Sequence, residues 1–259
     1  IYRLVAYELD MARASVLVWL VLAATAAAGG LYAYWSRRVA VDKSVSPLPP
    51  RAPVRAWEKW LTATVLAMLA VCCLLPLAAV WLKAAAAGSS WAVLLEAQTW
   101  AAAWNTIRFS AAAVAAATVL GVLYAAAARQ MAWLRALMFL PFMVSPVCIA
   151  FGVLLLYPQW TASLWLLTAT YALLAYPFVA KDVLAAWDGL PKDYAAAART
   201  MGANGFQTAC YVTAPLLKPA LRRGLTLASA TCIGEFAATL FLSRPEWQTL
   251  TTLIYDYLG

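Results

Sequence analysis

Long apolar stretches separated by polar connections dominate the chain. A helix that crosses a bilayer needs about 20 mostly apolar residues, because its backbone groups must bond within their own segment in lipid. Six stretches meet this requirement: 14–35, 60–82, 107–128, 134–157, 164–187 and 224–242. The pattern therefore predicts an all-α fold, a polytopic transmembrane bundle with about six spans.

Composition supports a membrane protein over a soluble one. Hydrophobic residues make up 65% of the chain and charged residues only 12%, whereas a soluble domain is roughly half apolar and about a quarter charged. The 13 Trp and 12 Tyr fit the aromatic belts at membrane interfaces. We expect a lipid bilayer around the chain.

The positive charges predict how the spans are oriented. The net charge of +8 could indicate nucleic-acid binding, but the bases fall between apolar stretches instead of along one stripe. The first, third and fifth connections hold nearly all of them: Arg37, Arg38, Lys43, Arg51, Arg55, Lys59, Arg129, Arg135, Lys181, Lys192, Arg199, Lys218, Arg222 and Arg223. The second connection has essentially Lys83 alone. By the positive-inside rule, connections one, three and five face the cytoplasm, and no nucleic-acid partner is expected.

The fifth connection, 188–219, is long and patterned. Pro191 suits a first helical turn, residues 194–201 favour a helix, and Gly202 and Gly205 allow a sharp turn. A second short helix over 206–212 is expected to stop ahead of Pro215. This helix-turn-helix is too polar for lipid and too apolar for water, so we expect it to occupy a protein groove. The alternative is a helix that rests on lipid headgroups.

The spacing of this connection resembles the cytoplasmic "EAA" loop of bacterial ABC-importer permeases. Ala197, Ala198, Gly202, Val212 and Pro215 match the motif, while Ala196 replaces its usual Glu and Ala214 its Leu. Further similarity lies in Asn105-Thr106, Leu140-Pro141, Ser145-Pro146 and the run Ala175-Tyr176-Pro177-Phe178. The resemblance implies a type I importer permease fold in a bacterial inner membrane.

The same resemblance implies partners and a contact surface. The partners are an ATP-binding subunit dimer, a periplasmic solute-binding protein and another permease half. The loop residues that would engage the ATP-binding subunit are Ala196, Ala197, Ala198, Gly202, Ala203, Phe206, Val212 and Pro215. The absence of the motif's Glu at Ala196 puts one polar contact in doubt.

The C-terminal residues resemble thiamine and ferric-iron permeases, in which two permease domains are fused. The resemblance rests on Gly234-Glu235-Phe236 and on residues 243–250. It implies a thiamine-like or ferric substrate. The Ile-Tyr pairs at Ile1 and Ile254 fit one period of a tandem duplication, or they coincide by chance.

These observations predict three segments. Residues 1–38 would be the last helix of a preceding permease repeat, and the proline-rich stretch 39–56 a cytoplasmic linker. Residues 57–259 would be the second permease domain, with its core at 100–259 and its last helix missing.

Glu235 is the one acid deep in an apolar stretch, and it is a candidate for the translocation pathway. It could meet a cationic substrate, or it could bond neighbouring helices as a structural group. Ser145, Pro146, Tyr176 and Pro177 complete the candidate pathway, because broken helices in membranes often line cavities. Plain kinks are the alternative.

No catalytic residue, metal site or cofactor is predicted. The chain has no histidine and no G-x-x-x-x-G-K-[ST] loop, so a partner subunit must bind the ATP. The rival function is a secondary transporter driven by an ion gradient through Glu235, and a third possibility is a membrane scaffold.

Overall fold

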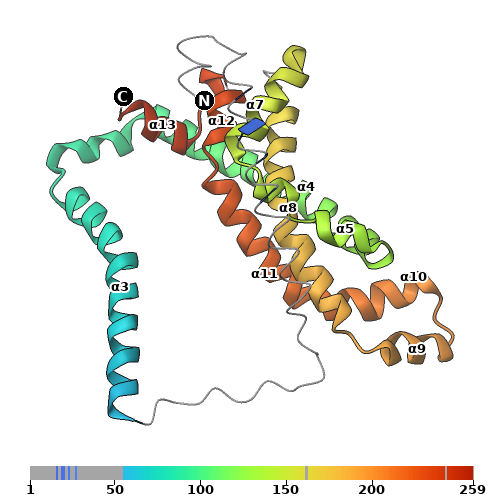
Figure 1. Cartoon of the computed structure of the whole chain (residues 1–259). Coiled ribbons are helices and arrows are strands. Elements are labelled where there is room, and N and C mark those ends of the chain that lie inside the picture. The colour runs from blue at the N-terminus through green and yellow to red at the C-terminus, as the bar shows by residue number, and fades with distance from the viewer. Residues whose placement is uncertain are drawn as a thin grey trace. The chain divides into compact units, whose positions relative to one another are not determined.

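The computed structural model describes residues 55–160, 163–242 and 244–258, together with Val16, Trp19, Leu20, Ala23 and Ala27. Within these residues the regular structure is helical, as predicted (Figure 1). The expected end helix 1–38, its span 14–35 and the linker 39–56 lie almost entirely outside the described residues. The chain divides into two units, Arg38–Thr99 and a second that comprises Ile1–Arg37 and Trp100–Gly259.

The unit Arg38–Thr99 is built on one long helix, α3 (Ala56–Ala85). None of its 30 residues is buried, and its most apolar window has a mean hydropathy of 2.6. At about 1.5 Å per residue, α3 is long enough to cross a hydrocarbon layer of about 30 Å. A bare apolar helix of this kind requires lipid or protein around it. α3 confirms the predicted span 60–82.

A short helix, η1 (Gly88–Leu95), follows α3. Gly88 has a φ of 52°, which lets the chain turn after the long helix. The indole nitrogen of Trp91 donates to the carbonyl of Ala84 at 3.0 Å, and this bond satisfies one of the last α3 carbonyls.

The second unit is organised around three long helices: α4 (Ala97–Gln130), α8 (Leu164–Asp188) and α11 (Ala214–Ile233). α4 and α8 confirm the predicted spans 107–128 and 164–187. The buried face of α4 consists largely of small residues: Ala102, Ala113, Ala117, Gly121, Ala125 and Ala128. Small residues let helices approach closely in lipid, where the hydrophobic effect does not drive helices together.

α8 and α11 lie side by side (Figure 1), and Val179 of α8 lies against a glycine of α11 and a glycine of α4. A Cβ atom added to Gly224 of α11 would lie 2.8 Å from the Cα of Val179. A Cβ atom added to Gly121 of α4 would lie 2.7 Å from the Cβ of Val179. The two glycines therefore set how near α4 and α11 come to the middle of α8.

The predicted span 134–157 is not one straight helix. It consists of α5 (Ala132–Leu137), α6 (Leu140–Met143) and α7 (Pro146–Leu156), with a bend of 94° between Trp133–Met143 and Pro146–Leu156. Pro146 begins α7, and the residue before a proline is driven out of the helical conformation. By length and composition the described residues contain three spanning helices, or four if this bent pair counts as one.

The predicted span 224–242 is also divided. α11 begins at Ala214, well before Gly224, and ends at Ile233. After a break at 234–236 the chain continues in α12 (Ala237–Leu242), η4 (Pro245–Trp247) and α13 (Leu250–Asp256). A count of six spans is therefore not confirmed.

The close approach at Gly224 generates a prediction. Gly224→Ala would place a methyl group against backbone atoms of Val179 and Phe178, at 2.8 and 3.3 Å, so α11 must shift. We expect a loss of about 1–3 kcal/mol in stability, measured as a lower thermal-unfolding midpoint in detergent. Gly152→Ala in α7 is the matched control, because nothing lies within 4 Å of its added Cβ. Equal midpoints for the two variants would contradict this account of the packing.

Candidate functional site

The first arm of the patterned connection is α9 (Lys192–Thr200). Pro191 precedes it as the N-cap residue, in an extended conformation, and Asp193 and Arg199 lie in its first and last turns. Both charges suit the helix dipole. Gly202 then has a φ of +89°, and the amide of Ala203 donates to the carbonyl of Ala198 at 3.0 Å. The predicted turn at Gly202 is confirmed, since this φ favours glycine.

The second arm begins at α10 (Gly205–Thr208). Asn204 caps it: Asn204 Oδ1 accepts from the amide of Gln207 at 2.8 Å, and Gln207 Oε1 accepts from the amide of Asn204 at 2.9 Å. Gly205 is the first residue of α10. Its φ is not positive, unlike that of Gly202. The capping box, together with Gly202, ends one helix and begins the next within four residues of sequence.

The prediction that the second arm stops ahead of Pro215 is wrong. α10 runs directly into η3 (Ala209–Thr213), a π-helical turn, and then into α11, near whose start Pro215 lies. Proline has no amide hydrogen and its ring crowds the preceding turn. A π-helical turn widens the helix by one residue, so the chain passes the proline without breaking.

The residues predicted for this loop divide by exposure. Ala196, Ala197, Gly202, Phe206 and Pro215 are exposed, whereas Ala198, Ala203 and Val212 are half-buried. Large apolar side chains on the same element are also in the open: Met201 is 88% exposed, Phe206 77% and Tyr211 79%. Because this element is too polar to lie in lipid, these three side chains are the candidates for contact with another protein. We call Met201, Phe206 and Tyr211 the apolar tip.

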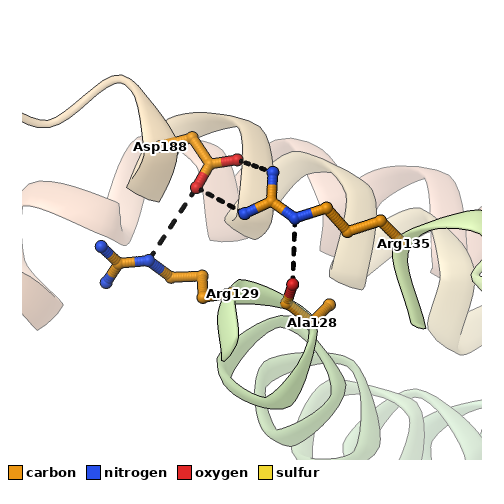
Figure 2. Close-up of polar contacts among 4 residues, drawn as sticks. All are labelled: Ala128, Arg129, Arg135 and Asp188. Carbon is orange, nitrogen blue, oxygen red and sulfur yellow. Dashed lines mark hydrogen bonds and ion pairs between the residues drawn. The ribbon is translucent and has the colours of Figure 1, made fainter. Parts of the chain in front are cut away.

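An ion pair ties α5 to the end of α8, where the loop begins (Figure 2). Arg135 Nη1 and Nη2 lie 2.7 and 3.2 Å from the two carboxylate oxygens of Asp188, the last residue of α8. Arg135 Nε donates to the carbonyl of Ala128 in α4 at 2.9 Å. Because both side chains are partly exposed, the pair contributes about 1 kcal/mol or less. The pair matters for position more than for stability, because Arg135 bonds both the end of α8 and the end of α4 and so holds them side by side.

Arg129 holds a looser position in the same cluster. Its Nε lies 3.9 Å from Asp188 Oδ1, and its guanidinium carbon is 4.8 Å from the centre of the Trp187 ring. Sequence reasoning missed this cluster. The signal that could have found it is one acid, Asp188, at the end of an apolar stretch and opposite the bases of the third connection.

A cavity of about 390 Å³ lies between the end of α8, α9, and the continuous helix of α10, η3 and α11. Residues that line it include Arg129, Trp187, Tyr194, Ala196, Arg199 and Val212. We call it the Arg129 cavity. It brings two of the predicted loop residues, Ala196 and Val212, together with two arginines.

A second cavity, of about 570 Å³, is lined by α4, α11 and Leu250. Its polar groups are the hydroxyls of Thr106, Ser110, Thr118 and Ser229, and we call it the hydroxyl cavity. Ser110 Oγ is buried without a hydrogen-bond partner among the described residues. The sequence signal was a row of hydroxyl residues, Thr106, Ser110 and Thr118, at helical spacing on α4.

Glu235 lies in the break between α11 and α12, where it is 9% exposed. Its Oε1 accepts from the amide of Ala238 at 3.0 Å, so its side chain bonds the start of α12. Its carbonyl accepts from the hydroxyls of Tyr171 at 3.2 Å and Thr251 at 3.1 Å. The geometry favours the structural role for Glu235 over direct contact with a cationic substrate.

The other predicted pathway residues lie on two elements. Ser145 and Pro146 lie at the bend before α7, with Ser145 half-buried and Pro146 exposed. Tyr176 and Pro177 are buried inside α8, and the rings of Tyr176 and Tyr124 are 5.3 Å apart. Neither the Arg129 cavity nor the hydroxyl cavity includes any of these residues or Glu235.

With this geometry in place, comparison with known proteins identifies the family. The family model for the "binding-protein-dependent transport system inner membrane component" matches residues 117–257, more than half of the chain. The chain belongs to this family. It is a family of transport-system membrane components and not of enzymes, as the sequence predicted.

Individual relatives are similar over parts of their length. A protein described as a candidate 2-aminoethylphosphonate transport system permease, from Salmonella typhimurium, is 28% identical over 65% of this chain and 64% of its own length. The sulfate transport system permease protein CysT of Escherichia coli is 33% identical over 48% of this chain and 50% of its own. CysW of Synechococcus elongatus, also named for sulfate, is 34% identical over 40% and 41%. The chain thus spans less than two thirds of these curated relatives.

Glu235 generates a prediction that separates its two roles. Gln at this position keeps an oxygen that can accept from the Ala238 amide, whereas Ala removes it. We expect Glu235→Gln to keep both fold and transport, and Glu235→Ala to lose about 1–2 kcal/mol of stability. Thermal unfolding in detergent and uptake in proteoliposomes measure the two effects. A Gln variant that folds normally yet no longer transports would instead assign a role to the charge.

Proposed function

We propose that the chain is the membrane-spanning permease part of an ATP-driven importer in a bacterial inner membrane. Family membership supports the transport role. The observation that carries the coupling assignment is the α9–Gly202–α10–η3 element, on which the side chains of the apolar tip are exposed. A secondary transporter would need no such element, and the relatives named here lend that rival no support.

The partner for the apolar tip is an ATP-binding subunit. Water is an unfavourable environment for the large apolar side chains of Met201, Phe206 and Tyr211. Burial of one such side chain against a partner contributes about 1.5–3 kcal/mol to the free energy of binding. The continuous helix from Gly205 through α11 gives a stiff connection from this contact to the bundle. Closure of a bound ATPase dimer would move that helix against α8.

Two further partners complete the importer. A soluble binding protein would deliver the solute outside, and a second permease half would close the pathway. The expected domains at 1–38, 39–56 and 57–259 remain part of this proposal, as does a cytoplasmic location for the first, third and fifth connections.

For the substrate we propose an oxyanion of the sulfate or phosphonate type. The relatives are named for sulfate and 2-aminoethylphosphonate, and they lend no support to the thiamine-like or ferric substrate expected from residues 234–250. In the hydroxyl cavity, Ser110 and Ser229 supply uncharged donors that can bond an oxyanion, whereas the hydroxyls of Thr106 and Thr118 already donate to carbonyls of α4. The carboxylate of Glu235, which had suggested a cation, bonds α12 instead.

The substrate proposal predicts a selective uptake pattern. We expect the complete importer, with its ATPase and binding protein in proteoliposomes, to take up sulfate, molybdate or 2-aminoethylphosphonate when ATP is present inside. Thiamine and ferric citrate, offered with the same binding protein, should not enter. Uptake of thiamine or iron in preference to every oxyanion would contradict the substrate class. A chain that never retains an ATP-binding subunit on purification would contradict the importer itself.

The turn at Gly202 predicts a coupling defect. A Cβ atom at Gly202 or at Gly205 would meet nothing within 4 Å, but only Gly202 has a positive φ. Gly202→Ala therefore strains the backbone by about 1–2 kcal/mol, whereas Gly205→Ala does not. We expect Gly202→Ala to lower ATP-dependent uptake roughly fivefold or more, with membrane insertion intact. Equal uptake in the two variants would argue against the coupling role of the turn.

A further inference from the structure

The Arg129 cavity has an excess of positive charge that the described contacts do not neutralise. Arg129 and Arg199 line it, and its described lining contains no Asp or Glu. The nearest carboxylate, Asp188, is engaged by Arg135 at 2.7 Å and is 3.9 Å from Arg129. Figure 2 shows the terminal nitrogens of Arg129 pointing away from Asp188. Those donors remain for another acceptor.

Three further lining residues suit an oxyanion, in a cavity whose other walls are largely apolar. Trp187 holds the guanidinium of Arg129 against its ring, which orients the group, and Tyr194 and Thr213 add hydroxyls. Guanidinium groups bond phosphate oxygens in a bidentate way, with charge-assisted hydrogen bonds. A volume of about 390 Å³ exceeds the needs of a bare anion and admits one with an organic substituent.

The place of the cavity in the chain also fits. It lies at the end of α8, where an apolar helix gives way to Trp187, Tyr194 and arginines. Such a combination is typical of the membrane interface, where basic pockets bind anionic lipid headgroups. Ala196 lines the cavity at the position where the loop motif usually has Glu, so the chain lacks a carboxylate that would neutralise the site.

We propose that the Arg129 cavity binds a phosphate-type oxyanion between Arg129 and Arg199. The anion is either the headgroup of an anionic phospholipid or a free inorganic anion, since the two present the same oxygens. The site is separate from the hydroxyl cavity and needs no ATP-binding subunit. Its failure would therefore leave the proposed transport function unaffected.

The test measures binding to the complete permease, purified without its ATPase. One arm compares retention of phosphatidylglycerol and phosphatidylcholine by native mass spectrometry, and the other follows radiolabelled phosphate and sulfate by equilibrium dialysis. We expect saturable binding in one arm, which identifies the source. Arg129→Gln and Arg199→Gln should each weaken it about tenfold or more. Arg223→Gln, an exposed arginine outside the cavity, is the matched control and should leave binding unchanged.

A second pair of variants tests the role of charge without changing Arg129, in case the Arg129 variant does not fold. Ala196→Glu adds a carboxylate to the cavity and should abolish binding, while Ala196→Gln, of the same size and neutral, should keep most of it. Equal loss in both variants would show that charge does not select the ligand, and would overturn the proposal. It is also overturned if neither probe binds saturably to the unsubstituted permease.

Discussion

The close approach of three helices around Val179 is the contact on which the bundle depends. An apolar side chain gains little free energy when it moves from lipid to a helix interface, because both are apolar. Helices in lipid therefore associate through tight packing. Gly121 and Gly224 remove the side chains that would hold α4 and α11 away from the backbone of α8. Because that contact sets the position of α8, it also sets the position of everything that α8 carries at its end.

The loop between α8 and α11 is attached to this packed helix pair at both of its ends. The end of α8 is tied to α4 through Asp188, Arg135 and the carbonyl of Ala128. The chain then reverses at Gly202 and returns through α10 and η3 into α11, which packs on α8 again. The loop is therefore held at both ends by the same helix pair. Phe206 and Tyr211 of the apolar tip lie on the helix that continues into α11 and so into the α8–α11 contact.

The short helices after α11 are constrained by a different requirement. Buried backbone amides and carbonyls must have hydrogen-bond partners. The break at 234–236 frees amides and carbonyls inside the bundle. The Glu235 carboxylate bonds the Ala238 amide, and hydroxyls from Tyr171 and Thr251 bond the Glu235 carbonyl. The side chain of this one acid in an apolar stretch thus bonds a backbone amide at the start of α12. The hydroxyl cavity carries no charge on its described lining.

Sequence alone determined the helical membrane class, the long spans now seen as α3, α4 and α8, the Gly202 turn and the family of the loop. Each depends on local properties: run length, glycine at a positive φ, and motif spacing. Tertiary structure decided the 94° bend before α7, the division of the last span and the passage through Pro215. It also decided which groups bond Glu235 and the pairing of Arg135 with Asp188. These depend on which distant groups meet, and hydropathy along the chain carries no information about that.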